Sequence, residues 1–155
     1  MYSIIKKVKN MSAIFKNLCY NYFRINERGK IMPKIRIKAM LIGNETNHNV
    51  TGKGILQNDK IIYQETGLQV VIEKKDNQVI LKRSCKEYEL VLPFTNNEKT
   101  SGVYKIIEYS MILDAEIYTK KLVMNNQEIK ITYELTLGGE FLGEYTYDLV
   151  YEVIK

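Results

Sequence analysis

Residues 128–154 read EIKITYELTLGGEFLGEYTYDLVYEVI, and this stretch decides the fold. Apolar side chains occupy most alternate positions on each side of Gly138-Gly139, from Ile129 to Leu137 and from Phe141 to Val153. Alternation with a period of two residues is typical of strands that bury one face. The stretch therefore predicts two antiparallel strands joined by a tight turn, and it indicates an all-β protein.

The length of the turn decides which side chains face each other across this hairpin. A two-residue turn would pair Leu137 with Glu140 and put acidic residues on the apolar face. A three-residue turn, 138–140, pairs Leu137 with Phe141 instead, so that the two faces agree. We predict this turn, although a β-bulge would shift the register by one residue. The predicted register also pairs Tyr133 with Tyr145, Ile131 with Tyr147, and Lys130 with Asp148.

Charge divides the chain near Met32. Residues 1–31 hold seven Lys or Arg and one acidic residue, whereas residues 32–155 hold sixteen basic and seventeen acidic residues. The net charge of +5 therefore comes from the extension, and no nucleic-acid-binding surface is expected on the body. Residues 32–155 are long enough to form one domain with its own core.

Two interpretations of the extension, residues 1–31, stay open. It has the spacing of a basic amphipathic helix, which would dock on a membrane or on a partner protein. Alternatively, these residues are not native, because codons for residues 27–31 can resemble a ribosome-binding site ahead of a start codon at Met32. A signal peptide and a spanning helix are not expected, since no continuous apolar segment is present. The helical apolar positions are Met1, Ile4, Ile5, Val8, Met11, Phe15, Leu18, Cys19 and Tyr22.

The body shows a succession of short strand patterns without a convincing helix. A polar segment, 43–54, is expected to be a loop that contains His48, and residues 96–102 form a second expected loop. Pro93 is expected to end the strand before it. Apolar alternation predicts strands at 35–41, 61–65, 68–74, 78–83, 88–92, 103–109 and 111–123, followed by the final hairpin.

About eight or nine antiparallel strands suit a single up-and-down β-barrel. Closure hides the strand edges, and an interior of this size is filled by side chains or holds one small ligand. A β-sandwich stays open as an alternative. A parallel α/β sheet is disfavoured, because helical apolar patterns between the strands are missing.

Short motifs along the body carry a family resemblance. They are Thr51-Gly52-Lys53-Gly54, Ile62-Tyr63-Gln64-Glu65, Val79-Ile80-Leu81-Lys82-Arg83, Leu92-Pro93-Phe94, Thr100-Ser101-Gly102-Val103-Tyr104, Thr119 and Ile131-Thr132-Tyr133-Glu134-Leu135. Taken in this order, the motifs resemble the YwiB-like family of small bacterial proteins over roughly residues 34–155. The resemblance implies a calycin-like, lipocalin-type β-barrel and no particular activity. The chain departs from the family pattern at Cys85, where Gly is usual, and at Ile106-Ile107, which replaces a Thr-Pro segment.

The residues give no complete catalytic, metal or cofactor motif. His48, the only histidine, is expected in a polar loop without a nucleophile to activate. Cys19 and Cys85 cannot form a disulfide within the body, which suits a reducing cytoplasm, and they are too few for a zinc site. Gly52-Lys53-Gly54 lacks the spacing of a phosphate-binding loop and is interpreted as a turn.

Two charged residues have inward parity, which means that they continue the alternate strand positions whose side chains are expected to point into the barrel. Glu65 continues Ile61 and Tyr63, and Arg83 continues Val79 and Leu81, so both are expected near a barrel mouth. They can extend to the rim or pair with each other without any function. Alternatively, Arg83 meets a ligand carboxylate or phosphate, while tyrosine hydroxyls orient the ligand. The candidate ligand-binding residues are Arg83, Glu65, Tyr63, Tyr104, Tyr133 and Tyr145, and Tyr88, Tyr147 and Tyr151 share the inward parity.

Three functional hypotheses follow. The first is a barrel that binds a small molecule, which requires an interior that side chains do not fill. The second is a cytoplasmic interaction or scaffold protein with a packed barrel and an exposed apolar patch. The third is an enzyme that uses Tyr, Arg and Glu, the residue types found in the calycin-like phenolic acid decarboxylases. It requires these residues to converge on one cavity.

Overall fold

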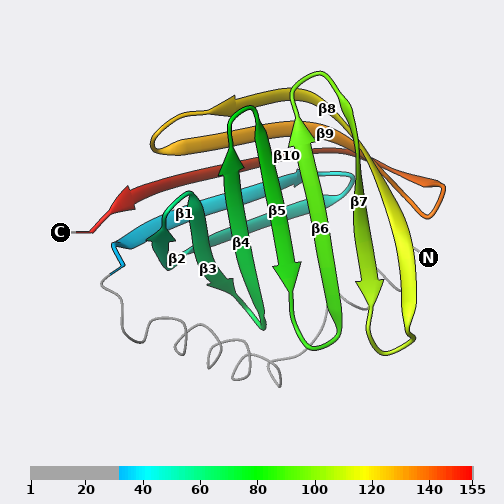
Figure 1. Cartoon of the computed structure of the whole chain (residues 1–155), viewed down its shortest axis with the longest axis horizontal. Helices are drawn as coiled ribbons and strands as arrows, with labels where there is room; N and C mark the ends of the chain where they lie inside the picture. Colours follow the sequence, from blue (N-terminus) through cyan, green and yellow to red (C-terminus); the bar gives the residue numbers. More distant parts are fainter. Residues whose placement is uncertain (1–31, 155) are drawn as a thin grey trace.

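The computed structural model describes residues 32–154, which form a closed antiparallel β-barrel (Figure 1). Each strand pairs with the next along the chain, and β10 pairs with β1 to close the barrel. The predicted all-β barrel is confirmed, with one strand more than the expected range. The ten strands are β1 (Lys34–Gly43), β2 (Thr46–Gln57), β3 (Lys60–Glu65), β4 (Leu68–Lys75), β5 (Gln78–Ser84), β6 (Tyr88–Thr95), β7 (Lys99–Ile106), β8 (Met111–Met124), β9 (Glu128–Leu137) and β10 (Glu140–Val153).

The barrel is flattened into two layers that face each other across the core. Figure 1 shows β4 to β7 running across the direction of β1, β9 and β10, as in orthogonally packed sheets. The long strand β8 bends between the two layers, and its pairing with β9 shifts register between Thr119 and Lys121. A bulge at this position lets one strand take part in both layers.

The core consists of the inward-facing side chains of these strands. In β9, Ile129, Ile131, Tyr133, Leu135 and Leu137 are all buried, and the residues between them are more exposed. This confirms the predicted alternation. Burial of each large apolar side chain contributes about 1.5–3 kcal/mol, so the inward residues supply most of the stabilisation.

The turn between β9 and β10 differs from the predicted one. Leu137 pairs with Glu140, so the turn has two residues, and the predicted pairing of Leu137 with Phe141 is wrong. The additional residue lies one step later, where the register shifts between Phe141 and Gly143. Beyond this bulge, Tyr133 pairs with Tyr145 as predicted. The bulge returns the apolar residues of both strands to one face.

The segment 43–54 is not a loop. A tight turn with positive φ at Asn44 and Glu45 leads directly into β2, so His48 lies on a strand opposite Leu41. The first part of β2 pairs with β1, whereas its register with β3 begins at Gly54. In this part of the strand only Val50 packs against the core, and the polar residues around it give no apolar alternation, which explains why its sequence resembles a loop.

Pro93 and the following polar segment also differ from their predicted roles. Pro93 lies inside β6, where it pairs with Ile80 of β5, and β7 begins already at Lys99. Proline has no N–H to donate to a neighbouring strand. The pairing of β6 with β7 runs from Tyr88 to Val91, so Pro93 lies beyond it and no donor is missing there. The carbonyl of Pro93 accepts a hydrogen bond from the Thr100 hydroxyl, which holds β7 beside it.

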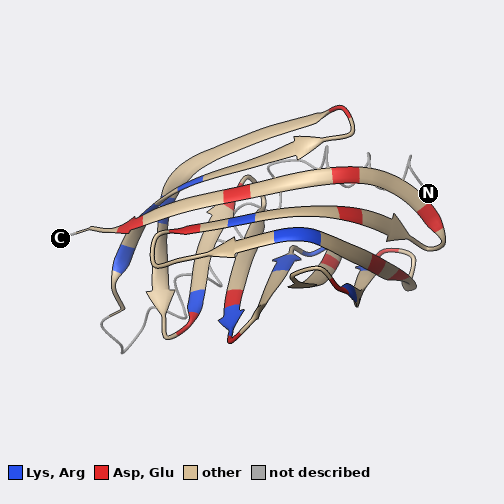
Figure 2. Ribbon diagram, turned by 90° about the horizontal axis from the view of Figure 1, so that it is seen from above, with Lys and Arg blue, Asp and Glu red and all other residues tan. Residues whose placement is uncertain are grey.

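The extension lies outside the described residues, and so do both interpretations of it. In the barrel, charged positions of both signs are distributed over neighbouring strands (Figure 2), in keeping with the near-neutral balance of the body. None of the described residues forms a helix with the length and hydrophobicity that crossing a membrane requires.

The bulge at the start of β10 depends on Gly143. This residue has a φ of +137°, and a Cβ there would lie 3.0 Å from the Asn44 Cβ. We expect Gly143→Ala to lower the free energy of unfolding by about 2 kcal/mol. Gly52→Ala is the matched control, because a Cβ at Gly52 meets no atom within 4 Å. Urea denaturation of both variants checks the prediction, and equal effects would contradict it.

Candidate functional site

A cavity of about 110 Å³ lies inside the barrel. Seven leucines, five tyrosines and Arg83 line it. Most of these residues come from the strand ends next to the turns at 44–45, 85–87, 107–110 and 138–139, which an antiparallel meander brings to one end of the barrel. The cavity therefore occupies this end of the interior and is mainly apolar.

The sheet register places Arg83 among inward-facing neighbours. One row of paired residues crosses five strands, and directly paired residues point to the same face of a sheet. Arg83 therefore faces the interior together with the tyrosines at both ends of the row. The row runs from Tyr63 through Val70, Arg83 and Leu90 to Tyr104.

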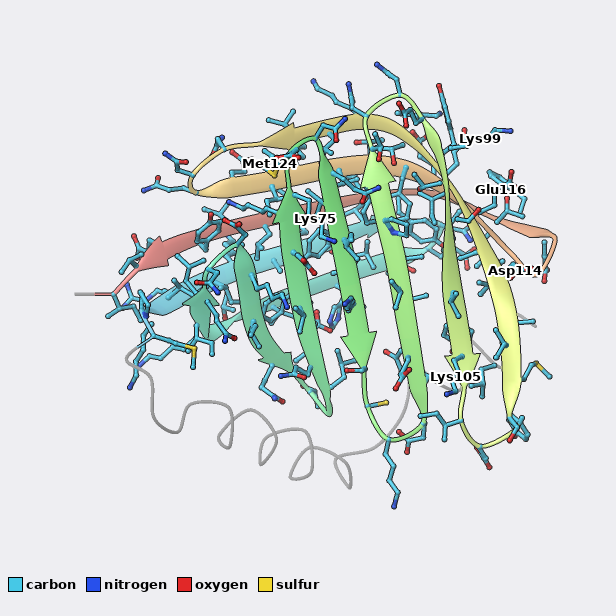
Figure 3. The ribbon with its side chains drawn as sticks, viewed as in Figure 1. Lys75, Lys99, Lys105, Asp114, Glu116 and Met124 are labelled. Carbon is cyan, nitrogen blue, oxygen red and sulfur yellow. The ribbon has the colours of Figure 1, made fainter. Side chains whose placement is uncertain are left out.

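Lys105, which follows Tyr104 on β7, points away from the interior. Lys105 is exposed, and so are Lys99 on the same strand and Asp114 and Glu116 on β8 (Figure 3). The charged residues of these two strands thus lie on the outer face, while Tyr104 lies on the inner one. Arg83 is unusual because it carries a charge on the inner face.

Arg83 and Glu65 form the predicted ion pair. Arg83 Nη2 donates to Glu65 Oε2 at 2.6 Å, and β4 lies between their two strands. The side chains are 19% and 5% exposed, respectively, so the pair is largely shielded from water. His48 Nε2 lies 3.5 Å from the same carboxylate oxygen. The residue that was expected in a loop therefore contacts the ion pair from β2.

The surroundings of Glu65 keep its carboxyl ionised. Burial alone raises the pKa of Glu65, but the guanidinium of Arg83 and the nearby His48 outweigh burial and hold this pKa below its ordinary value of 4.5. The Glu65 carboxylate in turn raises the pKa of Arg83, against the effect of burial. The pair thus carries one positive and one negative charge at neutral pH.

The inner tyrosines stay protonated. Burial raises the pKa of Tyr63, Tyr104, Tyr133 and Tyr147, and it does the same for Tyr88. The hydroxyls of Tyr63 and Tyr147 share a hydrogen bond of 2.6 Å, next to the ion pair. Because the phenols keep their protons at neutral pH, they can donate hydrogen bonds to a bound molecule.

Two buried polar atoms of the cavity residues make no hydrogen bond with any described residue. They are Arg83 Nε and the Tyr104 hydroxyl oxygen. Buried polar groups are nearly always hydrogen-bonded, and an unsatisfied one costs about 1–3 kcal/mol. Both residues line the cavity, which leaves room for a hydrogen-bond partner beside them.

The structure brings four of the six candidate residues to the cavity wall. Arg83, Tyr104, Tyr133 and Tyr145 line it, whereas Tyr63 and Glu65 lie outside the lining and contact Tyr147 and Arg83. Tyr88 and Tyr147 also line the cavity and are not among the predicted ligand residues, although their inward parity is a signal for both. Tyr151 shares this parity but accepts a hydrogen bond from Lys74, away from the cavity lining.

The remaining chemistry-bearing residues form no separate centre. Residues 32–154 contain no group of three or more His, Cys, Asp or Glu side chains arranged to hold a metal ion. Burial raises the pKa of the Cys85 thiol to about 11, so this cysteine is a poor nucleophile at neutral pH. Its Sγ contacts the Glu87 carboxylate at 3.2 Å.

The ion pair gives a stability test. Arg83→Ala leaves the Glu65 carboxylate buried without its partner, so we expect a loss of about 3 kcal/mol or more in the free energy of unfolding. Arg36→Ala is the matched control, because Arg36 and Glu152 form an exposed pair at 2.9 Å. Its loss should stay below about 1 kcal/mol. Chemical denaturation measures both, and a double-mutant cycle with Glu65→Ala measures the coupling. A small loss for Arg83→Ala would show a solvated pair.

The lowered pKa of Glu65 predicts a pH dependence. A carboxyl whose pKa is lower in the folded state stabilises the fold above its unfolded pKa, and this contribution disappears as the pH falls through the folded pKa. The unaltered protein should therefore lose stability more steeply than Glu65→Gln as the pH falls below about 5. Urea denaturation at a series of pH values provides the comparison. Parallel curves for the two proteins would refute this assignment.

Comparison with known proteins confirms the family resemblance. The family model described as Domain of unknown function (DUF1934) matches residues 34–149. Among solved structures, the crystal structure of the ywiB protein from Bacillus subtilis is similar, with a TM-score of 0.54 and 14% sequence identity over 80% of this chain and 93% of that chain. At this identity the likeness shows the fold alone. No curated protein is significantly similar in sequence. Since the family model covers nearly the whole barrel, this chain belongs to the DUF1934 family.

Proposed function

We propose that the barrel binds one small molecule in its interior. The observation that carries this proposal is the cavity of about 110 Å³, whose apolar wall includes two residues with unsatisfied buried polar atoms. Ligand sites typically combine an apolar wall with a few polar groups that fix orientation. The calycin-like architecture that the family resemblance implies supports the same function, because small barrels of this type have room for one ligand.

The size of the cavity limits the ligand. An apolar cavity of about 150 Å³ in another protein accepts benzene, and drug-sized ligands occupy about 300–1,000 Å³. A cavity of about 110 Å³ therefore suits a compact molecule of roughly one ring. A long acyl chain or a nucleotide would extend beyond this space.

The protonation states favour binding over acid–base catalysis. Buried phenols with raised pKa values donate hydrogen bonds but do not accept protons at neutral pH. The Glu65 carboxylate is held by Arg83 and lies outside the cavity lining, which leaves it poorly placed to act as a base. The enzyme hypothesis required Glu65, Arg83 and a tyrosine in one cavity, and of these the lining contains only Arg83 and tyrosines.

The interaction hypothesis comes second. Its expectation of a packed interior conflicts with the cavity, but one end of the β7–β8 hairpin does expose apolar side chains. Ile107, Tyr109, Met111 and Ile112 are between 38% and 63% exposed. Nothing among the described residues shows what would cover them. The cytoplasmic location stays a prediction.

Native mass spectrometry tests the binding proposal. Protein purified from the organism that encodes it should carry a retained small molecule, detected as a mass shift that denaturing conditions remove. Leu135→Phe enlarges a side chain of the cavity wall and should abolish the mass shift. The variant should lose at most about 3 kcal/mol in the free energy of unfolding. Val150→Phe, at an exposed position of β10, should keep the shift. A bound mass that survives in Leu135→Phe would place the ligand elsewhere, and apo protein in every preparation would refute the proposal.

A further inference from the structure

We infer that the molecule bound in the barrel is electrically neutral and carries a hydrogen-bond acceptor, such as the carbonyl oxygen of a cyclic ketone. This inference rests on the proposed function and specifies its ligand. The alternative that Arg83 suggests at first, a carboxylate or phosphate ligand, conflicts with the contacts of this arginine.

The charge of Arg83 is already compensated. Among the described residues, Arg83 is the one charged side chain of the cavity lining, and the Glu65 carboxylate contacts it at 2.6 Å. An anion that enters the cavity would lose its hydration and approach Glu65 in a largely apolar space. The cavity lining offers it no second cation in return. A neutral molecule avoids both penalties.

The unsatisfied polar atoms indicate which group the ligand carries. Arg83 Nε–H can only donate, and the Tyr104 hydroxyl, which like any phenol carries its proton at neutral pH, can donate as well as accept. Both residues line the same cavity. A ligand oxygen that accepts from either donor would satisfy a group that no described residue satisfies.

The shape of the wall favours a ring. The Tyr133 and Tyr145 rings are stacked, with centroids 5.7 Å apart and an interplanar angle of 26°, and both belong to the lining. Leucine side chains supply most of the remaining wall. Flat aromatic faces and methyl groups pack well against a compact carbocycle, whereas they leave a branched polar molecule without partners.

Three probes with the same ring separate the ligand classes. We propose NMR titration of the full chain at pH 7.5 with cyclohexanone, cyclohexane and cyclohexanecarboxylate, which differ in their polar group. Cyclohexanone should bind about fivefold or more tightly than either of the others, since its acceptor adds one hydrogen bond without a charge. Tighter binding of the carboxylate would overturn the inference, and so would the absence of cyclohexanone binding. A retained molecule in native mass spectrometry would still uphold the proposed function in either case, so the two failures are distinguishable.

Two variants test the physical causes separately. Glu65→Gln removes the compensating charge, so cyclohexanecarboxylate should bind about tenfold or more tightly than it does to the unaltered chain. Tyr104→Phe removes a hydroxyl that lacks a protein partner, so cyclohexanone affinity should fall about three- to tenfold without a loss of thermal stability. Tyr109→Phe, at an exposed position, is the matched control and should leave the affinity unchanged.

A loss of stability in Tyr104→Phe with unchanged affinity would assign its hydroxyl a structural role and contradict the inference. Unchanged carboxylate affinity in a folded Glu65→Gln protein would show that compensation by Glu65 does not exclude anions. If Glu65→Gln does not fold, the three probes and Tyr104→Phe still decide between the ligand classes.

Discussion

The pairing of β1 with β10 is the constraint on which the rest of the structure depends. It joins the first and last strands over the register from Ile35–Val153 to Ile42–Thr146. An open sheet of ten strands would expose two edges and one apolar face, and closure removes both problems at once. Closure also turns the inward face into a largely buried interior. The ion pair and the inner tyrosines owe their environment to this pairing.

Enclosure changes what the inner polar residues can do. In water, Arg83 would be a freely available cation, but inside the barrel it needs a partner, and Glu65 supplies one across β4. The same burial raises the pKa of the Tyr133 and Tyr147 hydroxyls further above neutral pH. The interior therefore offers hydrogen-bond donors with little net charge.

The close approach of two strand ends shapes one side of the cavity. Gly43 and Gly143 both have positive φ, and a Cβ at Gly43 would lie 2.1 Å from the Glu144 carbonyl oxygen. Asn44 Nδ2 donates to the Leu142 carbonyl at the same place. Leu41 and Leu142, which line the cavity, lie beside these glycines. The glycines thus allow the end of β1 and the bulge of β10 to meet where the cavity wall is formed.

The sequence by itself determined the strands that cover the core, because burial of one face imposes alternation on residues such as Ile129 to Leu137. Parity likewise determined that Arg83 and Glu65 point inward, and the spacing of their strands predicted their contact. Only the tertiary structure decided the place of β2, whose first part pairs with β1 and is too polar to show the alternation of a buried face.

Tertiary structure alone also decided the bulge after Phe141, since a two-residue turn with a bulge and a three-residue turn give the same register beyond Gly143. The tertiary structure also decided which of the inward-facing residues line the cavity. Tyr63 and Tyr104 have the same parity and belong to the same row, yet Tyr104 lines the cavity and Tyr63 does not. Parity determines the face of a sheet, whereas a cavity depends on how far the opposite layer lies from it.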